Sequence, residues 1–269
     1  MSAIIDKPIN FSVTHKKDSS FKNLNNVKIF NIKGAHPSGN ESFQINKIDP
    51  LNFGETIWVI KPEDLSNIGA FFSSGIFSSS RTVAISGDSL KSPKYYSTCI
   101  GASISSLINS DEINDIKNYR FINGDPLSGS KVEYSEFLGF YNNSLSVIEE
   151  GNNYRMLGWL PFMYNSIPSF SKTSLSWLLG GAKKVNTNLN GEERAIVVTG
   201  EMEKYFPMDI FPMQLIKACM RGDIEKMESL GIYEVVPEDF GLVDFSCTSK
   251  IETQEIIKSG IEIMLKEVG

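Results

Sequence analysis

The chain contains two histidines, and one of them, His36, lies in a loop rich in glycine and proline that could bind a ligand. Gly34 and Gly39 permit backbone conformations that are closed to other residues, and Pro37 favours an extended conformation at His36. Such a loop can bring backbone amides close to a ligand. The alternative is a rigid turn in which the histidine caps a neighbouring carbonyl group. His15 lies in the polar stretch THKKDSS, where we expect it to be solvated.

A second loop of the same kind is NGDPLSG, residues 123–129. Its proline and two glycines preset a tight turn. This turn could approach a partner, or it could merely reverse the direction of the chain. The sequence leaves both explanations open.

No recognisable catalytic motif accompanies these loops. The sequence lacks GxGxxG, GxxxxGK[ST], HExxH and GxSxG, the usual markers of nucleotide binding, zinc proteases and serine hydrolases. The cysteines Cys99, Cys219 and Cys247 are far apart, and no CxxC pair is present for a zinc site or an iron–sulfur cluster. We therefore predict no metal ligand in this chain.

The composition is that of an ordinary globular protein and argues against several classes of partner. The formal net charge of -6 disfavours non-specific nucleic-acid binding, which needs a basic surface. No stretch approaches the roughly 18 apolar residues that a membrane span needs. Asp6 and Pro8 interrupt the start of the chain, where a signal peptide would need its apolar segment. The widely spaced cysteines fit a reducing, cytoplasmic location.

The first third of the chain is predicted to be an α/β layer. The alternating run 27–32 and the apolar run 56–60 are typical of strands, as is RTVAIS at 81–86. A helix is expected to begin at Pro62, with Leu65, Ile68 and Phe72 on one face, and to end at Gly75. The first 25 residues show little periodicity, as though their sheet were incomplete.

The remainder changes from mixed to helical. A short helix at 104–108 and strands at 145–148 and 193–198 predict an α+β arrangement after residue 90. After Pro207 the apolar spacing indicates helices, one over 210–220 and a last one that begins with the S-x-x-E capping box at Ser249.

Four segments, taken together, resemble the NqrA family of the sodium-translocating NADH:quinone oxidoreductases. They are GAHPSGN (34–40), RTVAISGDSLKSPKYYSTCIGAS (81–103), NGDPLSGSKV (123–132) and NGEERAIVVTGEMEKYFPMDIFPMQL (190–215). The resemblance covers about residues 27 to 269. Members of that family carry a long portion ahead of GAHPSGN, so this chain resembles a C-terminal fragment. The family is similar to RnfC and to the flavin-binding subunit of complex I.

The resemblance implies a multidomain fold of mixed α+β and α/β class. Residues 1–90 would be the remainder of a Rossmann-like domain, 91–200 an SLBB domain of β-grasp type, and 201–269 a C-terminal helical domain. The relatives with an iron–sulfur cluster hold it on clustered cysteines of that helical domain. Only Cys219 and Cys247 occur there, so we expect neither an iron–sulfur cluster nor FMN in this chain.

The resemblance also implies a function. The chain would be a peripheral component on the cytoplasmic face of the bacterial inner membrane, part of a sodium-pumping NADH:quinone reductase. It would contribute to binding the quinone substrate, for example ubiquinone, and would assemble on NqrB and other subunits. Contact with the membrane would be made only through those partners, and this chain alone would not be catalytic.

Two sets of residues are the candidates for these roles. A quinone needs hydrogen-bond donors for its carbonyl oxygens and apolar walls for its ring. The candidate quinone residues are Gly34, His36, Pro37, Gly39, Phe43 and Trp58. The candidate docking loop consists of Gly124, Pro126, Ser128 and Gly129. The alternative is a purely structural platform for assembly with no ligand pocket in this chain.

Overall fold

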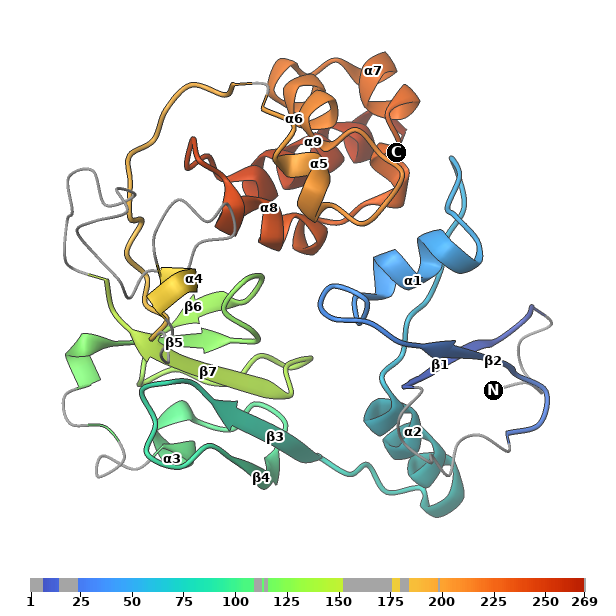
Figure 1. Ribbon diagram of the computed structural model, residues 1–269. Helices are drawn as coiled ribbons and strands as arrows, with labels where there is room; N and C mark the ends of the chain where they lie inside the picture. Colours follow the sequence, from blue (N-terminus) through green and yellow to red (C-terminus); the bar gives the residue numbers. More distant parts are fainter. Residues whose placement is uncertain are drawn as a thin grey trace.

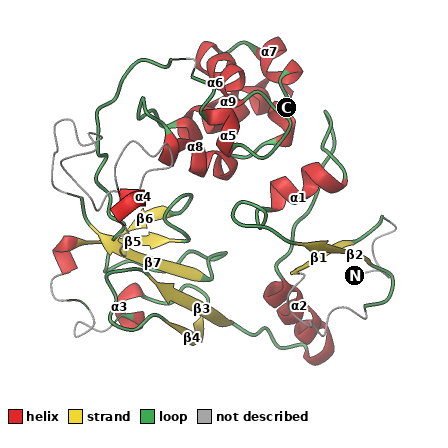
Figure 2. Ribbon diagram, in the orientation of Figure 1, coloured by secondary structure: helices red, strands yellow, loops and turns green. Residues whose placement is uncertain are grey.

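The computed structural model describes residues 7–14, 24–108, 113, 116–151, 176–179, 184–197 and 199–268, and all structural statements refer to these. The described residues form three parts (Figure 1). An N-terminal part contains two short strands and two helices, a middle part contains a larger sheet, and a C-terminal part is helical, as the colours of Figure 2 show. This mixed α/β and α+β arrangement is the fold class that the sequence predicted. His15 and residues 109–112 lie outside the described residues.

The N-terminal part has a small parallel sheet. Strands β1 (Asn10–Thr14) and β2 (Lys28–Ile32) pair from Asn10 opposite Lys28 to Thr14 opposite Ile32. The prediction of a strand at 27–32 is thus confirmed. Helices α1 (Glu41–Ile48) and α2 (Pro62–Ser74) follow.

Helix α2 begins and ends where the sequence predicts. Pro62 occupies its first turn, where its fixed φ suits a helix and its missing N–H is not needed. Gly75 ends the helix with φ 71° in the left-handed region, which glycine adopts without a Cβ penalty. The expected apolar face is not covered, however, because no residue of α2 is buried among the described residues.

The prediction of a strand at 56–60 is wrong. These residues have no regular secondary structure and belong to neither sheet of the described residues. A strand requires a neighbouring strand for its N–H and C=O groups, and no described strand pairs with this segment.

The middle part is built on a five-stranded sheet of order β4-β3-β7-β5-β6. Its strands are β3 (Ser80–Ser86), β4 (Lys94–Cys99), β5 (Tyr119–Asn123), β6 (Ser130–Val132) and β7 (Ser144–Glu149). Among the described strands of this sheet, the β3–β7 pair is the parallel one and the others are antiparallel. The short helices are α3 (Ile104–Leu107), η3 (Ile116–Asn118) and α4 (Ser176–Leu179).

Residues 81–86 belong to the sheet of the middle part, whereas the first domain was expected to extend to residue 90. This strand pairs antiparallel with β4 and parallel with β7. The strand joins this sheet because its side chains alternate, which places Val83 and Ile85 in the core of the middle part. Leu145 and Val147 belong to the same core. The predicted strand at 145–148 is confirmed as β7.

The C-terminal part is a compact set of helices. They are α5 (Met202–Tyr205), α6 (Pro212–Arg221), α7 (Ile224–Ser229), η4 (Ile232–Glu234), η5 (Pro237–Phe240), α8 (Gly241–Ser246) and α9 (Thr253–Val268). Their shared core includes Met213, Leu215, Phe240 and Ile257, all essentially buried. The helix predicted at 210–220 is confirmed as α6.

Two predictions at the edges of this part are wrong. Residues 193–197 form no strand, because they bind to the helical part: the N–H of Arg194 donates to the carbonyl of Ser249 at 2.8 Å. Val198, the last residue of that predicted strand, lies outside the described residues. Helix α9 starts at Thr253 instead of at the S-x-x-E box. There, Asp244 accepts hydrogen bonds from the backbone N–H and the hydroxyl of Thr253.

Candidate functional site

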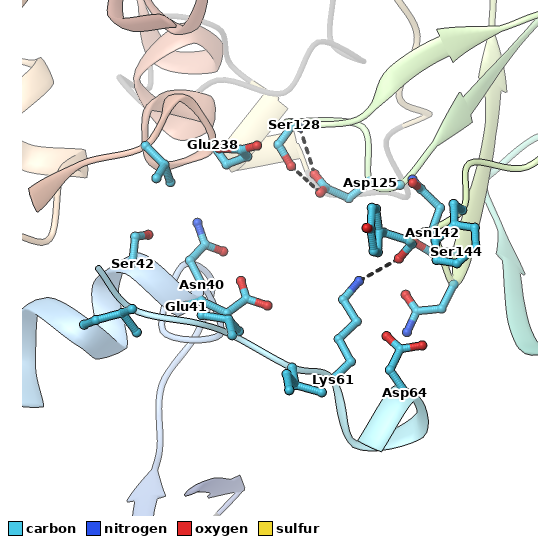
Figure 3. Close-up of a pocket in the computed structure, with 18 of the residues that line it drawn as sticks. Asn40, Glu41, Ser42, Lys61, Asp64, Asp125, Ser128, Asn142, Ser144 and Glu238 are labelled. Carbon is cyan, nitrogen blue, oxygen red and sulfur yellow. Dashed lines mark hydrogen bonds between the residues drawn. The ribbon is translucent and has the colours of Figure 1, made fainter. Parts of the chain in front are cut away.

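A cleft of about 1010 Å³ lies where the three parts meet. The close-up in Figure 3 shows side chains that enter it from the start of α1, from the segment before α2 and from two loops of the middle part. Residues 233–238 of the helical part supply the last wall. The volume is at the upper end of the ~300–1,000 Å³ that is usual for small-molecule sites.

One wall of the cleft is apolar. Ile68 and Phe71 reach it from α2. Ile57, Val59 and Ile60 reach it from the segment before that helix. Phe140 and Tyr141 of the middle part also line the cleft, with their rings 4.9 Å apart in an edge-to-face contact. Apolar and aromatic walls with few polar groups are typical of sites for flat organic ligands.

A buried arginine lines the same cleft. Arg81 is only 1% exposed, and its Nη2 lies 2.9 Å from Asp64 and donates to the carbonyl of Phe140 at 3.3 Å. Glu63 is 3.8 Å from Nη1. Nε and Nη1 have no hydrogen-bond partner among the described residues, and the same holds for the buried Oδ1 of Asn123.

These unpartnered atoms are notable because both residues line the cleft. A buried polar atom without a partner costs about 1–3 kcal/mol. Arg81 would supply donors and Asn123 an acceptor to a ligand that enters deeply. Lys61 provides a third polar group, since its Nζ donates to the carbonyl of Tyr141 at 3.0 Å across the cleft (Figure 3).

The loop at 123–129 forms another wall and is held by Asp125. This carboxylate accepts hydrogen bonds from the N–H groups of Leu127 (2.8 Å) and Ser128 (3.1 Å) and from the Ser128 hydroxyl (2.6 Å). Burial alone would raise the pKa of Asp125, but these hydrogen bonds outweigh it and hold the pKa below its usual value. A smaller electrostatic contribution from His36 also lowers the pKa of Asp125.

The same loop contacts the helical part. Gln254 of α9 donates to the carbonyl of Leu127 at 2.9 Å. A Cβ atom placed on Gly241 would lie 3.1 Å from the Leu127 side chain, so this contact is close. The predicted docking loop therefore packs on helices of its own chain.

Helix α1 is also attached to the helical part. Ser42 donates to Asp239 at 2.5 Å, and Asn46 donates to Glu234 at 2.6 Å. Asp239 is buried, and this burial raises the pKa of its carboxyl group above the usual value. The walls of the cleft are thus linked through both α1 and the 123–129 loop.

The structure divides the sequence-predicted residues among several places. Gly124, Ser128 and Gly129 line the cleft, whereas Pro126 is exposed and does not. Trp58 is 89% exposed and lines neither hollow.

The other predicted residues lie around a smaller hollow. Gly34, His36 and Gly39 line this second hollow, of about 700 Å³, at the carboxyl ends of β1 and β2, where open α/β sheets commonly bind ligands. Pro37 is half-buried within the same loop but is not part of the lining. Phe43 instead packs against the core of the helical part.

Sequence reasoning missed Arg81, Asn123 and the α2 side chains that line the cleft. A signal for Arg81 was present: it occupies the same alternating positions as Val83 and Ile85, and a charged side chain on the inward face of a strand is unusual. No comparable signal marks Ile68 or Phe71, because helix α2 looks like any amphipathic helix whose apolar face packs in a core.

Two negative findings refer to the described residues alone. They contain no cluster of three or more His, Cys, Asp or Glu side chains that could hold a metal ion. Among the helices of this portion, none has the length and apolar character needed to cross a membrane.

Comparison with known proteins gives a consistent result. Residues 1–77 match the family model described as "NqrA second alpha/beta domain", and residues 82–134 match the SLBB model described as "NQRA C-terminal domain". The chain is 32% identical over 272 residues to the NqrA component of the Na(+)-translocating NADH-quinone reductase of Neisseria meningitidis, a match that spans 99% of this chain and 60% of the relative.

The corresponding components of the same reductase from other bacteria are similar. The protein of Pasteurella multocida is 34% identical over 248 residues (90% of this chain, 54% of the relative). That of Rhodopirellula baltica is 32% identical over 248 residues (90% and 53%). The chain therefore spans 53–60% of the length of these relatives.

Proposed function

Because the chain belongs to the NqrA family of the Na(+)-translocating NADH-quinone reductases, we propose that it serves such a reductase and holds its quinone substrate. The cleft between the three parts is the proposed site. The observation that carries this proposal is the combination, in one hollow, of an apolar wall with buried polar atoms that lack partners among the described residues.

The cleft suits the chemistry of a quinone. A quinone ring is flat and apolar and would lie against Ile68 and Phe71. Its carbonyl oxygens accept hydrogen bonds and would be stabilised by a donor such as Lys61 or Arg81. The reduced quinol carries hydroxyl groups, which can also donate to an acceptor such as the Oδ1 of Asn123.

In this proposal the chain binds and positions its substrate and performs no bond chemistry of its own. It needs no nucleophile or general base. FMN, iron–sulfur clusters, NADH oxidation and sodium transfer belong to other subunits. The chain would lie peripherally on the cytoplasmic face of the bacterial inner membrane, assembled on NqrB, and would touch the membrane only through its partners.

A second candidate function is a platform for assembly with no ligand. It is favoured by the exposed apolar side chains of the N-terminal part, which are more typical of an interaction surface than of an isolated protein. Both functions can coexist, but only the first requires saturable quinone binding by this chain.

The test is a titration of the purified chain with a short-chain ubiquinone, followed by isothermal calorimetry. Phe71→Glu places a charge on the cleft wall and should raise the Kd at least about tenfold, since loss of one aromatic contact costs about 1.5–3 kcal/mol. Phe72→Glu is the matched control, because Phe72 is adjacent on α2, is 76% exposed and does not line the cleft. Equal effects of the two variants would contradict the proposed site.

His36→Ala distinguishes the cleft from the smaller hollow. The cleft proposal predicts a Kd close to that of the unchanged protein, because His36 lines only the second hollow. A large loss of affinity in His36→Ala, together with normal binding by Phe71→Glu, would move the site to the loop at 34–39. No binding by any folded variant would leave the platform function.

A further inference from the structure

The charged groups that line the cleft are mostly hydrogen-bond acceptors. Among the described residues, two cations, Lys61 and Arg81, line it together with five carboxylates, those of Glu41, Asp64, Asp125, Glu234 and Glu238. An ionised carboxylate only accepts hydrogen bonds, whereas lysine and arginine only donate them. Figure 3 shows carboxylates on both sides of the hollow. The balance of charged groups in the cleft therefore favours a ligand that brings donors.

The two cations are already partly engaged by acceptors of the protein. Nη2 of Arg81 lies 2.9 Å from Asp64, and Glu63 lies 3.8 Å from Nη1. The guanidinium charge is thus balanced by two carboxylates. Nζ of Lys61 donates to the carbonyl of Tyr141 at 3.0 Å. Nε and Nη1 of Arg81 are left without a hydrogen-bond partner among the described residues, so they are free to meet an acceptor of a ligand.

Asn123 supplies a buried acceptor to the same cleft. This residue is 7% exposed, and its Oδ1 has no hydrogen-bond partner among the described residues. Its Nδ2 lies 3.5 Å from the carbonyl oxygen of Phe137, which leaves Oδ1 as the free end of the amide. A buried acceptor that has lost its water needs a donor. A ligand can satisfy Oδ1 only if it has an N–H or O–H group.

The two redox forms of a quinone differ in this respect. The carbonyl oxygens of the oxidised form only accept, so they can meet Arg81 but cannot satisfy Oδ1 of Asn123. Each hydroxyl group of the quinol donates one hydrogen and still accepts, so the quinol can meet both residues. The surrounding carboxylates also oppose loss of a proton from the quinol, since like charges repel, and the hydroxyl donors are therefore retained.

We propose that the cleft binds the reduced quinol more tightly than the oxidised quinone, and that Asn123 determines this preference. The preference rests on the proposed function, because it concerns the ligand of the same site. Reduction of a quinone takes up electrons and protons, and this chain supplies neither. It discriminates between the two forms and holds the product of a quinone reductase.

The experiment compares one short-chain ubiquinone in its oxidised form and in its chemically reduced form. Both are titrated into the full chain under argon and followed by isothermal calorimetry. We expect a Kd at least about fivefold lower for the quinol, because one buried acceptor gains a partner. Equal Kd values, or tighter binding of the oxidised form, would overturn the preference.

The midpoint potential of the bound quinone gives an independent readout. Tighter binding of the reduced form makes the bound quinone easier to reduce. A tenfold preference would raise the midpoint potential by about 30 mV relative to the free quinone. A potential that is unchanged or lowered on binding would contradict the preference.

Two variants test the role of Asn123. Asn123→Ala removes the amide without adding bulk, so it should raise the Kd of the quinol at least about fivefold and leave that of the quinone within about twofold. Asn123→Asp keeps an oxygen acceptor and should keep the preference. Asn31→Ala is the matched control, because Asn31 also lies on a strand but is exposed and lines neither hollow. Neither Kd should change in it.

The outcomes separate the preference from the proposed function. A preference that survives Asn123→Ala in a folded protein, or that is lost in Asn123→Asp, would overturn the role of Asn123. Saturable binding of both forms with equal affinity would overturn the preference and leave the quinone site in place. No saturable binding of either form by the folded chain would overturn both.

Discussion

The same substitution, glycine to alanine, should have opposite effects at two positions of this chain. Gly129 ends the 123–129 loop and lines the cleft, whereas Gly69 lies on the exposed surface of α2. A Cβ atom at Gly129 would lie 2.5 Å from the Cγ2 of Ile122 and 2.6 Å from the carbonyl oxygens of both Asn123 and Asp125. A Cβ atom at Gly69 would meet nothing within 4 Å.

The magnitudes follow from these contacts. Overpacking in a tight site costs about 1–3 kcal/mol, and we expect the upper half of that range for Gly129→Ala because two of the three obstructing atoms are backbone oxygens. Gly69→Ala instead gains about 0.5–1 kcal/mol, since alanine loses less conformational freedom in a helix interior. The two variants should therefore differ by about 3 kcal/mol in the free energy of unfolding.

Urea unfolding followed by far-UV circular dichroism measures this difference. With a slope of about 2 kcal/mol per molar urea, Gly129→Ala should lower the midpoint by ~1 M, and Gly69→Ala should raise it by a few tenths of a molar unit. Gly129→Ala should also weaken quinone binding, because the loop must move. Equal midpoints for the two variants would refute the close packing described for the 123–129 loop.

Two further predictions concern single side chains. Cys99 should react with Ellman's reagent in the native protein, whereas Cys219 and Cys247 should not, because Cys99 is exposed and the other two are buried. Burial also raises the pKa of the Cys219 thiol to about 11. More than one fast-reacting thiol would contradict this prediction. Burial raises the pKa of Asp239, so the folded state holds that proton more tightly than the unfolded chain. The stabilisation from Asp239 is therefore full below its unfolded pKa and is lost as the pH rises through the raised value. As the pH rises from about 3 to 7, the free energy of unfolding of the unchanged protein, measured with urea, should fall relative to that of Asp239→Asn. A difference between the two proteins that does not depend on pH would contradict this prediction.

Local elements of the fold could be predicted because their signals are local. Pro62 and Gly75 mark the ends of α2, and the alternation of Val83 and Ile85 marks β3. The sheet to which β3 belongs could not be predicted, because its parallel partner β7 begins 58 residues after β3 ends and nothing near Ser86 specifies that pairing.

The strand prediction at 56–60 failed for a different reason. The run satisfies the pattern of a strand, but pattern describes only the side chains, and a strand also needs a neighbour for its backbone groups. The absence of such a neighbour among the described residues could not be inferred from TIWVI itself.

The candidate site was only partly predictable. Glycine and proline signals correctly drew attention to two loops, and the 123–129 loop does line the cleft. The cleft itself combines segments from α1 to η5, more than 190 residues apart, as the Ser42–Asp239 hydrogen bond illustrates. Side chains such as Phe71 acquire their role only from this long-range arrangement.

The most direct test of the central claim is to locate the quinone by photolabelling. A photoreactive short-chain quinone would be cross-linked to the full chain, with unlabelled quinone as competitor, and the labelled peptides identified by mass spectrometry. If the quinone binds in the cleft, competed labels should appear on residues 57–71 and on Phe140 or Tyr141, the apolar walls of the cleft. Competed labels confined to residues 34–39, or no competed label on a folded chain, would contradict it.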